Sequence, residues 1–224
     1  MIPLWDNIPT RTFPWLTVLL ILINSGVFIY ELTLTPKELE LFFKTYGLLP
    51  VDILHGQFQY IFTSMFLHGG WEHLIGNMIF LWIFGNNVED ALGKIKFLIF
   101  YILSGVGAAL TQSIISILFG NFTIPMIGAS GAISGILAAY IKLYPHAKVV
   151  TFIPPFPILF ALPAWFFIGY WFFIQVLFAM IIPPTVGGVA WYAHVGGFIV
   201  GWYLIDAMYS PKKPKVVHYS SLER

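Results

Sequence analysis

The chain has 224 residues, of which 58% are hydrophobic and only 9% are charged, and its formal net charge is +1. Soluble domains carry about 25% charged residues, so this composition indicates a chain embedded in a lipid bilayer. The small net charge gives no reason to expect nucleic acid or an acidic substrate as a partner. The chain contains no cysteine, which excludes disulfides, thiol catalysis and cysteine-ligated metal sites.

Apolar runs divide the chain into six predicted membrane-spanning helices, because one span needs roughly 20 apolar residues. The runs cover residues 14–31, 60–88, 95–119, 128–144, 161–182 and 190–208. No cleavable signal peptide is evident, because no small-residue cleavage site follows the first run. We therefore expect an all-α polytopic membrane protein with a single domain over residues 1–224 and a basic tail at residues 210–224.

The segments between the runs differ in character. Residues 1–13 form a short polar and amphipathic lead. Residues 33–59 mix charges with phenylalanine and leucine, which predicts an interfacial loop containing short amphipathic helices. Residues 145–157 are rich in proline and predict an irregular connector.

The basic residues are distributed unequally between the two sides of the predicted bundle. With six spans, only Lys37 and Lys44 fall on one side. The other nine are Arg11, Lys94, Lys96, Lys142, Lys148, Lys212, Lys213, Lys215 and Arg224. By the positive-inside rule, this distribution predicts that both termini are cytoplasmic and that the loop at residues 33–59 faces outward.

Three polar residues on separate spans share one predicted depth. Ser130, His194 and Asn77 each lie twelve residues before a charged residue at the cytoplasmic edge. These charged residues are Lys142, Asp206 and Glu89, respectively. A helix rises about 1.5 Å per residue, so each polar side chain should lie about 18 Å above that edge, in a core roughly 30 Å thick. His73 lies one turn above Asn77 on the same helix face.

The fourth predicted span is too short to cross the bilayer. From Gly128 to Lys142 it covers about 21 Å, so its N-terminus should begin inside the membrane. Non-helical backbone at that depth is tolerated only where protein buries it or water reaches it. The sequence therefore predicts a water-filled pocket that opens outward.

Two glycine pairs predict a close contact between the fourth and sixth spans. Gly131 and Gly135 are four residues apart, as are Gly197 and Gly201. Small residues at this spacing let membrane helices approach each other backbone to backbone. A contact there would bring His194 within reach of the serine on the fourth span.

These residue types support a serine–histidine dyad. Histidine can act near neutral pH as the base that makes a serine hydroxyl nucleophilic. A triad would add a carboxylate, but Glu72, Asp206 and Glu89 lie outside the polar layer. The N-terminus of the fourth helix offers free N–H groups and the positive end of the helix dipole. Asn77 and His73 can donate hydrogen bonds to a developing oxyanion.

Each feature also has a less specific explanation. A serine among glycines is typical of helix packing, and a lone histidine in a membrane can be a satisfied buried residue. His68 and His73 suggest a metal site, but a spacing of five residues does not align on a helix. We therefore expect no metal. Polar groups inside a bilayer are costly and often functional, and the shared depth of three of them favours catalysis.

Three motifs follow one another along the chain. They are Phe62-Thr-Ser-Met-Phe-Leu67 leading into His68, His73 and Asn77, then Gly128-Ala-Ser130-Gly131, and then Ala193-His194-Val-Gly-Gly197. In this order they resemble the motifs of rhomboid intramembrane serine proteases of the six-span prokaryotic type. The resemblance covers residues 62–201 and implies a rhomboid-like helical bundle.

The resemblance implies a role for individual residues and no cofactor. Ser130 would be the nucleophile and His194 the general base, and His73, Asn77 and the Ser130 backbone N–H would bind the oxyanion. Supporting positions would be His68, Gly128, Gly131, Gly197, Gly201 and Glu89. His68 would bond into the first outer loop, and Glu89 would be an acid at the base of the second helix. Substrate gating and a cap would fall on the fifth span, which opens with Pro163-Ala-Trp165, and on the loop at residues 183–188.

Two positions depart from the family pattern. Many relatives carry Trp-Arg where this chain has Gln59-Tyr60, so the outer loop has a different anchor. One turn after the nucleophile, relatives often have an aromatic ring that packs on the histidine, whereas this chain has Ser134. Trp191 or Tyr192 could then supply the ring that holds the histidine.

We expect an endopeptidase of the cell membrane that cleaves transmembrane protein substrates within or near their membrane segment. One alternative is a catalytically silent rhomboid-like protein that binds membrane clients, although such relatives usually lack the serine or the histidine. Another is a small transporter or channel, which would need a continuous polar path. The fifth span contains only Gln175 as a polar residue for such a path.

Overall fold

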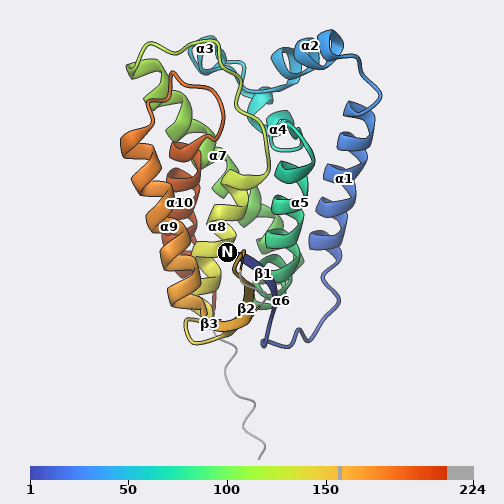
Figure 1. The fold of residues 1–224 in the computed structure, drawn as a ribbon, viewed down its shortest axis with the longest axis vertical. Coiled ribbons are helices and arrows are strands. Elements are labelled where there is room, and N and C mark those ends of the chain that lie inside the picture. Colours follow the sequence, from blue (N-terminus) through green and yellow to red (C-terminus); the bar gives the residue numbers. More distant parts are fainter. Residues whose placement is uncertain (156–157, 211–224) are drawn as a thin grey trace, which may run out of the picture.

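A bundle of helices with a small β-sheet at one end forms the computed structural model, which describes residues 1–155 and 158–210 (Figure 1). The helices are α1 (Trp15–Glu31), α2 (Pro36–Tyr46), α3 (Pro50–Leu54), α4 (Gln59–Ser64), α5 (Trp71–Phe80), α6 (Asn86–Leu92), α7 (Lys94–Leu118), α8 (Ser130–Leu143), α9 (Ala164–Ile181) and α10 (Trp191–Met208). The strands are β1 (Ile2–Asp6), β2 (Lys148–Phe152) and β3 (Leu159–Pro163). The expected basic tail lies outside the described residues, apart from its first residue.

Helix α8 is the centre of the bundle, and every residue from Gly131 to Tyr140 is buried. It has 14 residues and begins at Ser130, so its length is about 21 Å. The loop before it descends into the bundle, and α8 therefore starts below the top of α7 (Figure 1). This arrangement puts the first turn of α8 inside the protein rather than at its surface.

Glycines bring α8 and α10 into backbone contact, as their spacing predicted. A Cβ added to Gly197 would lie 2.0 Å from the carbonyl oxygen of Gly131, and one added to Gly201 would lie 2.4 Å from the Cα of Gly135. At the far end of the same two helices, the ammonium group of Lys142 forms an ion pair with Asp206. Helices α8 and α10 therefore pack side by side from their first turns to their last.

The second predicted span differs from the structure in its boundaries. Residues 60–70 form the end of short helix α4 and a turn, and a continuous helix runs only from Trp71 to Leu92. Its middle is a π-helical turn, η1 (Leu81–Gly85), between α5 and α6. The break follows the Gly69-Gly70 pair, because glycine has a low helix propensity and leaves the backbone free to turn.

Glu89, near the end of this helix, fixes the start of α1. Its carboxylate accepts hydrogen bonds from the backbone N–H groups of Leu16 and Thr17, at 3.0 and 2.8 Å. It also accepts one from the Thr17 hydroxyl at 2.8 Å. The first N–H groups of a helix have no partner within the helix, so a buried carboxylate that accepts them stabilises that terminus.

The segment between α1 and α4 contains two short helices, α2 and α3, as the sequence predicted for an interfacial loop. Helix α2 begins with a capping box formed by Thr35 and Glu38. The loop is tied to the bundle by the Thr63 hydroxyl, which donates to the carbonyl of Tyr46 at 2.6 Å. A backbone bridge between Leu48 and Met126 also holds this loop to the segment before α8.

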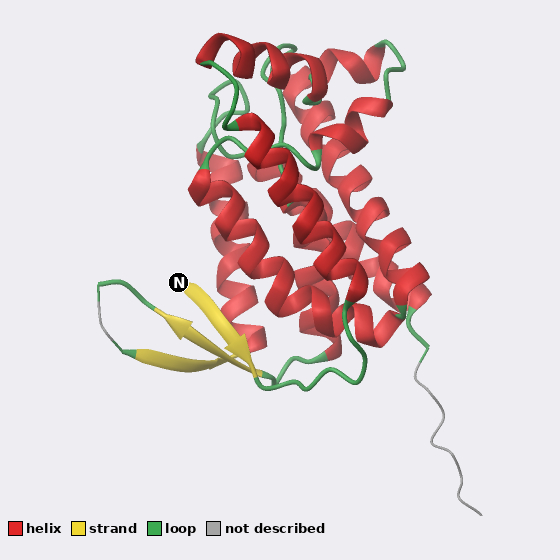
Figure 2. Cartoon of the chain, turned by 90° about the vertical axis from the view of Figure 1, so that its right-hand side faces the viewer, coloured by secondary structure: helices red, strands yellow, loops and turns green. Residues whose placement is uncertain are grey.

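The prediction of an all-α chain is wrong for two segments. The lead, the proline-rich connector and the residues just after it form an antiparallel sheet with the order β1-β2-β3, which projects from one side of the bundle (Figure 2). Strand β3 takes up the first residues of the predicted fifth span, whose helix therefore begins at Ala164 rather than at residue 161. The Asp6 carboxylate joins β1 to the helices, because it accepts hydrogen bonds from Tyr140 at 2.5 Å and Asn87 at 2.7 Å. Each strand has only five residues, and its partner lies far away or across a proline-rich turn, so local pattern gave no signal for it.

Two of the described helices, α7 and α9, are long and apolar enough to cross a membrane by length and composition. Helices α1 and α8 are shorter apolar helices of 17 and 14 residues. The predicted count of six spans therefore requires α1, α8, α10 and the composite helix Trp71–Leu92 to contribute as well.

Candidate active site

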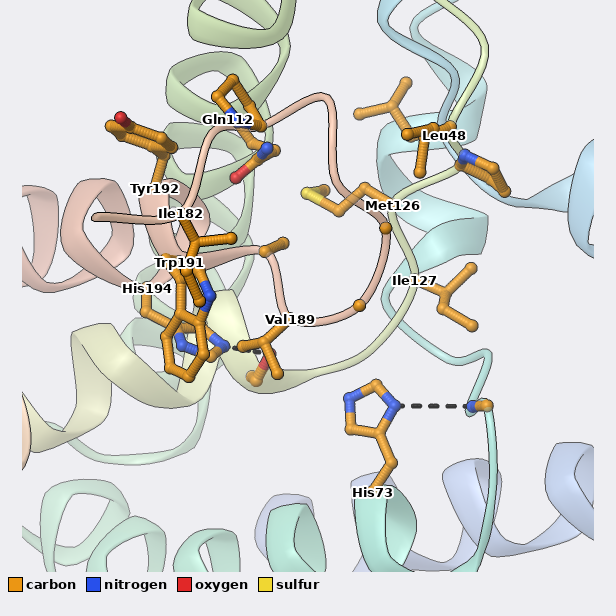
Figure 3. Close-up of a pocket in the computed structure, with 18 of the residues that line it drawn as sticks. Leu48, His73, Gln112, Met126, Ile127, Ile182, Val189, Trp191, Tyr192 and His194 are labelled. Carbon is orange, nitrogen blue, oxygen red and sulfur yellow. Dashed lines mark hydrogen bonds between the residues drawn. The ribbon is translucent and has the colours of Figure 1, made fainter. Parts of the chain in front are cut away.

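Ser130 and His194 meet where α8 and α10 begin. Ser130 is the first residue of α8, and His194 lies in the first turn of α10. The Ser130 Oγ lies 2.8 Å from the His194 Nε2, which is hydrogen-bonding distance. The imidazole is 8% exposed, whereas the serine is half-buried at the wall of a cavity. The geometry is that of a hydroxyl paired with a base (Figure 3).

The His194 imidazole is held by groups from α9 and from its own helix. Its Nδ1 lies 2.7 Å from the Oε1 of Gln175. The Trp171 ring lies 5.9 Å away between centroids, and the Trp191 ring 6.2 Å away in an edge-to-face arrangement. Ser134 does not take the place of the family's aromatic ring, because its hydroxyl donates to the carbonyl of Ser130 at 2.7 Å. Two tryptophans and an amide therefore position the base.

Gly128 forms a small space beside the serine. Its φ of +113° lies in a region that favours glycine. A Cβ added there would lie 2.6 Å from the Nε2 of His73 and 3.7 Å from the Nδ2 of Asn77. Both side-chain nitrogens therefore face the backbone just before the serine. A side chain at this position would collide with His73, so glycine fits between these nitrogens and the start of α8.

The first turn of α8 adds backbone donors to this space. The N-cap residue is Ala129, which has no side chain able to accept from the helix N–H groups. The first N–H groups of a helix have no partner within it and carry the positive end of the dipole. A negative charge that develops beside Ser130 would meet these groups and the nitrogens of His73 and Asn77.

The hydrogen bonds of His73 define which of its nitrogens can donate. The backbone N–H of Gly69 points at the His73 Nδ1 at 3.4 Å, so this nitrogen is the acceptor (Figure 3). A neutral imidazole has one acceptor and one donor nitrogen. The Nε2 of His73, which faces Gly128, is therefore the donor.

His68 orients Asn77 and does not bond through its ring into the first outer loop, which corrects the expectation from the family. Its Nδ1 lies 3.3 Å from the carbonyl oxygen of Phe66, which can only accept. The His68 Nε2 then accepts from the Asn77 Nδ2 at 3.0 Å. An amide nitrogen has two hydrogens, so the second remains for the space beside Gly128. The backbone N–H of His68 donates to Glu31, the last residue of α1, at 3.2 Å.

A cavity of about 780 Å³ connects these groups. Its walls include His73, Asn77, Ser130 and His194, together with segments 121–127 and 182–192. Figure 3 shows His73 and His194 on separate elements with Val189, from the second loop, in the same view. The volume lies in the range of sites that hold small ligands or a short peptide segment.

Two glutamines in the site were not predicted as functional residues. Gln175 holds the imidazole, as described above, and Gln112 on α7 accepts from the backbone N–H of Ala193 at 3.1 Å. Gln112 also donates to the Ser116 hydroxyl at 3.1 Å. The sequence feature that could have indicated them is an amide side chain within a membrane span, since such residues are costly in a bilayer and usually have a partner.

Comparison with known proteins agrees with these motifs. The rhomboid domain model matches residues 55–211. The chain is 30% identical over 206 residues to the rhomboid protease AarA of Providencia stuartii, an alignment that covers 83% of this chain and 69% of AarA. It is 29% identical to the mitochondrial rhomboid protein 1 of Saccharomyces cerevisiae, over 84% of this chain and 53% of that protein. It is 30% identical to the rhomboid protease GluP of Bacillus subtilis, over 71% of this chain and 28% of GluP.

The aligned shares mean that the chain spans only part of each relative, about half in the yeast protein and less in GluP. The matched domain nevertheless covers more than half of this chain, from the residue after α3 to beyond the end of α10, and it includes the serine, histidine and asparagine positions described above. The chain therefore belongs to the rhomboid family of integral membrane proteins.

Proposed function

We propose that this protein is an intramembrane serine endopeptidase that cleaves transmembrane proteins within or near their membrane segment. The observation that carries the proposal is the 2.8 Å hydrogen bond between Ser130 and His194 at the wall of a cavity. The rhomboid proteases among the relatives support the same reaction class. The reaction needs no metal or cofactor, because the serine is the nucleophile and the histidine is the base.

The first half of the reaction is acylation of Ser130. The His194 Nε2 takes the proton of the Ser130 hydroxyl as Oγ attacks the scissile carbonyl carbon. The negative charge on the carbonyl oxygen meets the backbone N–H of Ser130 and the side-chain donors of His73 and Asn77. His194 then gives its proton to the leaving amine, which breaks the peptide bond and leaves an acyl-enzyme.

The second half reverses the roles with water. A water molecule in the cavity loses a proton to His194 and attacks the acyl carbon, and the same donors bind the second oxyanion. The ester bond to the Ser130 oxygen then breaks, His194 returns its proton to that oxygen, and the carboxylic acid product leaves. Removing one such donor typically raises the barrier by about 2.7–4 kcal/mol. The donors are fixed before the substrate arrives, because Gly69 orients His73 and His68 orients Asn77. Little reorganisation is then needed in the transition state.

The proposed membrane arrangement has six spans and two cytoplasmic termini. The spans are α1, the composite helix Trp71–Leu92, α7, α8, α9 and α10. The supporting observation is the unequal distribution of Lys and Arg, which the positive-inside rule relates to orientation. The cavity would then open to the outer side, and substrate would enter past α9 and the loop at residues 183–188.

Cleavage of a model single-span substrate in liposomes tests the proposal. We expect Ser130→Ala to abolish cleavage without changing the thermal unfolding temperature. A matched control is Ser104→Ala, because Ser104 is a buried serine of the neighbouring helix α7 whose hydroxyl has no hydrogen-bond partner among the described residues. Unchanged cleavage by the Ser130 variant would refute the assignment.

A serine-directed fluorophosphonate probe separates the enzyme from a client-binding relative. The proposal predicts that wild-type protein reacts with the probe and that His194→Ala does not. A protein that binds the single-span substrate but neither cleaves it nor reacts with the probe would be the catalytically silent alternative.

A further inference from the structure

The partner of His194 on the side away from the serine is a neutral amide. Gln175, on α9, is 5% exposed and its Oε1 lies 2.7 Å from the His194 Nδ1. Serine proteases with a triad have a carboxylate in this position, which holds the imidazole in the tautomer that can accept the serine proton. We propose that Gln175 performs this positioning role here, an inference that rests on the proposed function of the dyad.

The orientation of the Gln175 amide follows from its second hydrogen bond. Its Nε2 donates to the carbonyl oxygen of Trp171, one turn earlier on α9, at 3.1 Å. A carbonyl oxygen can only accept, so the nitrogen of the amide must face Trp171. The amide oxygen must then face His194. The backbone of α9 therefore decides which end of the amide the imidazole meets.

The orientation of the amide in turn decides the tautomer of His194. An amide oxygen can only accept, so the Nδ1 that faces it carries the imidazole hydrogen. The Nε2 then has a lone pair, and it accepts from the Ser130 hydroxyl at 2.8 Å. In the other tautomer Nε2 would carry a hydrogen and could not take the serine proton. Gln175 therefore excludes the tautomer that cannot act as a base.

Among the described residues, Gln175 is the hydrogen-bond partner found for the His194 Nδ1. The flanking side chains are the rings of Trp171 and Trp191, and an indole has a hydrogen-bond donor but no acceptor. Without Gln175, an N–H at the buried Nδ1 would have no acceptor, which is costly. The tautomer with its hydrogen on Nε2 would then become more favourable, because Nε2 could donate elsewhere. Deletion of the amide oxygen is therefore expected to change the populations of the two tautomers.

An amide suits this position better than a carboxylate. An ionised carboxylate would bring a net charge to the buried depth of the dyad, whereas a glutamine is neutral and both of its polar ends have partners. The bond also crosses from α9 to α10, so the base is held in its active tautomer only while these two helices are packed together.

Two substitutions separate the amide oxygen from the bulk of the side chain. Gln175→Met keeps a similar length but cannot accept from Nδ1. Gln175→Glu keeps an acceptor oxygen and, if protonated, can still donate to Trp171. We expect Gln175→Met to lower kcat about 10- to 100-fold with little change in KM, and Gln175→Glu to restore most of the activity.

A control variant measures what the loss of any buried amide does. Asn24 in α1 is fully buried and donates to the carbonyl of Leu20, one turn earlier, as Gln175 does to Trp171. Its Oδ1 has no hydrogen-bond partner among the described residues. Asn24→Leu should therefore leave kcat of the folded protein unchanged. If it lowers kcat as much as Gln175→Met does, loss of packing explains both results and the proposal is wrong.

Nitrogen-15 NMR of histidine-labelled protein in liposomes gives a readout that does not depend on turnover. The His194 signals are identified by their loss in His194→Ala. We expect a protonated Nδ1 and an unprotonated Nε2 in the wild type and in Gln175→Glu, and a mixture in Gln175→Met. Identical signals in wild type and Gln175→Met would overturn the proposal, even if kcat falls.

The two readouts also separate this proposal from the proposed function. If the wild type shows no Ser130-dependent cleavage, the protease assignment fails, and the NMR comparison still decides whether Gln175 sets the tautomer. If cleavage depends on Ser130 but neither kcat nor the signals respond to Gln175→Met, the protease assignment stands and the role of Gln175 is refuted.

Discussion

Replacement of Gly197 by alanine should separate the two helices that carry the dyad. The added Cβ would lie 2.0 Å from the carbonyl oxygen of Gly131 and 2.9 Å from its carbonyl carbon. Real Cβ atoms essentially never come closer than 3.0 Å to another heavy atom, and here the obstacle is backbone. Helices α8 and α10 would therefore have to move apart by about 1 Å at this point.

This displacement acts close to the reaction centre. Gly197 lies one turn after His194 on α10, and Gly131 directly follows Ser130. A shift of about 1 Å would stretch the 2.8 Å hydrogen bond beyond hydrogen-bonding range. Misplacement of a reacting group by 1 Å can cost about 100-fold in rate, and overpacking costs about 1–3 kcal/mol of stability.

The assay measures kcat and KM for a single-span substrate in liposomes, and thermal unfolding in the same lipid. Gly26→Ala is the matched control, because a Cβ at this α1 position meets nothing within 4 Å. We expect Gly197→Ala to lose about 100-fold in kcat and to unfold at a lower temperature, and Gly26→Ala to keep the wild-type kcat and to unfold at no lower temperature than the wild type. Full activity in Gly197→Ala would refute the argument that backbone contact at the glycine pairs positions the dyad.

Two further predictions concern the oxyanion donors and the sheet. Asn77→Ala should lower kcat about 100- to 1,000-fold with a smaller effect on KM, measured by steady-state kinetics. A rise in KM with kcat unchanged would contradict a role specific to the transition state. At the sheet, burial raises the pKa of the Asp6 carboxyl above its ordinary value of 3.8, against the opposing hydrogen bonds from Tyr140 and Ile8. Because the folded-state pKa is raised, the stability contributed by the protonated form is complete below 3.8 and is lost as the pH rises through the raised pKa. Thermal unfolding measured across this range should show that loss in the wild type but not in Asp6→Asn, and the same slope in both would contradict the assignment to Asp6.

Local pattern was enough to predict the helices and the layer of polar residues. Hydrophobic runs located the main helices, because a membrane helix must satisfy its own backbone and cover it with apolar side chains. Counting residues from the charged ends indicated that Ser130, His194 and Asn77 share one depth. Glycines at a spacing of four indicated which helices touch. All of these features depend on helix geometry alone, which is the same wherever the helix lies.

Contacts between segments far apart in the chain were decided only by the tertiary structure. The pairing of β1 with β2 joins residues about 150 positions apart, and no local pattern marks either strand as a partner of the other. The break before α5 depends on the buried bond between Glu31 and His68 as well as on the Gly69-Gly70 pair. The sequence therefore predicted one long helix where the structure has two.

The same limit applies within the site. The sequence indicated that Ser130 and His194 could meet, because small-residue motifs and depth both point to that contact. It did not indicate that Gln175 would face His194, since the rotation of α9 about its own axis depends on packing against α10 and on the rings of Trp171 and Trp191. Sequence alone thus determined which groups are available at the depth of Ser130. The tertiary structure decided which nitrogen of each histidine faces which partner, because those directions depend on how neighbouring helices pack.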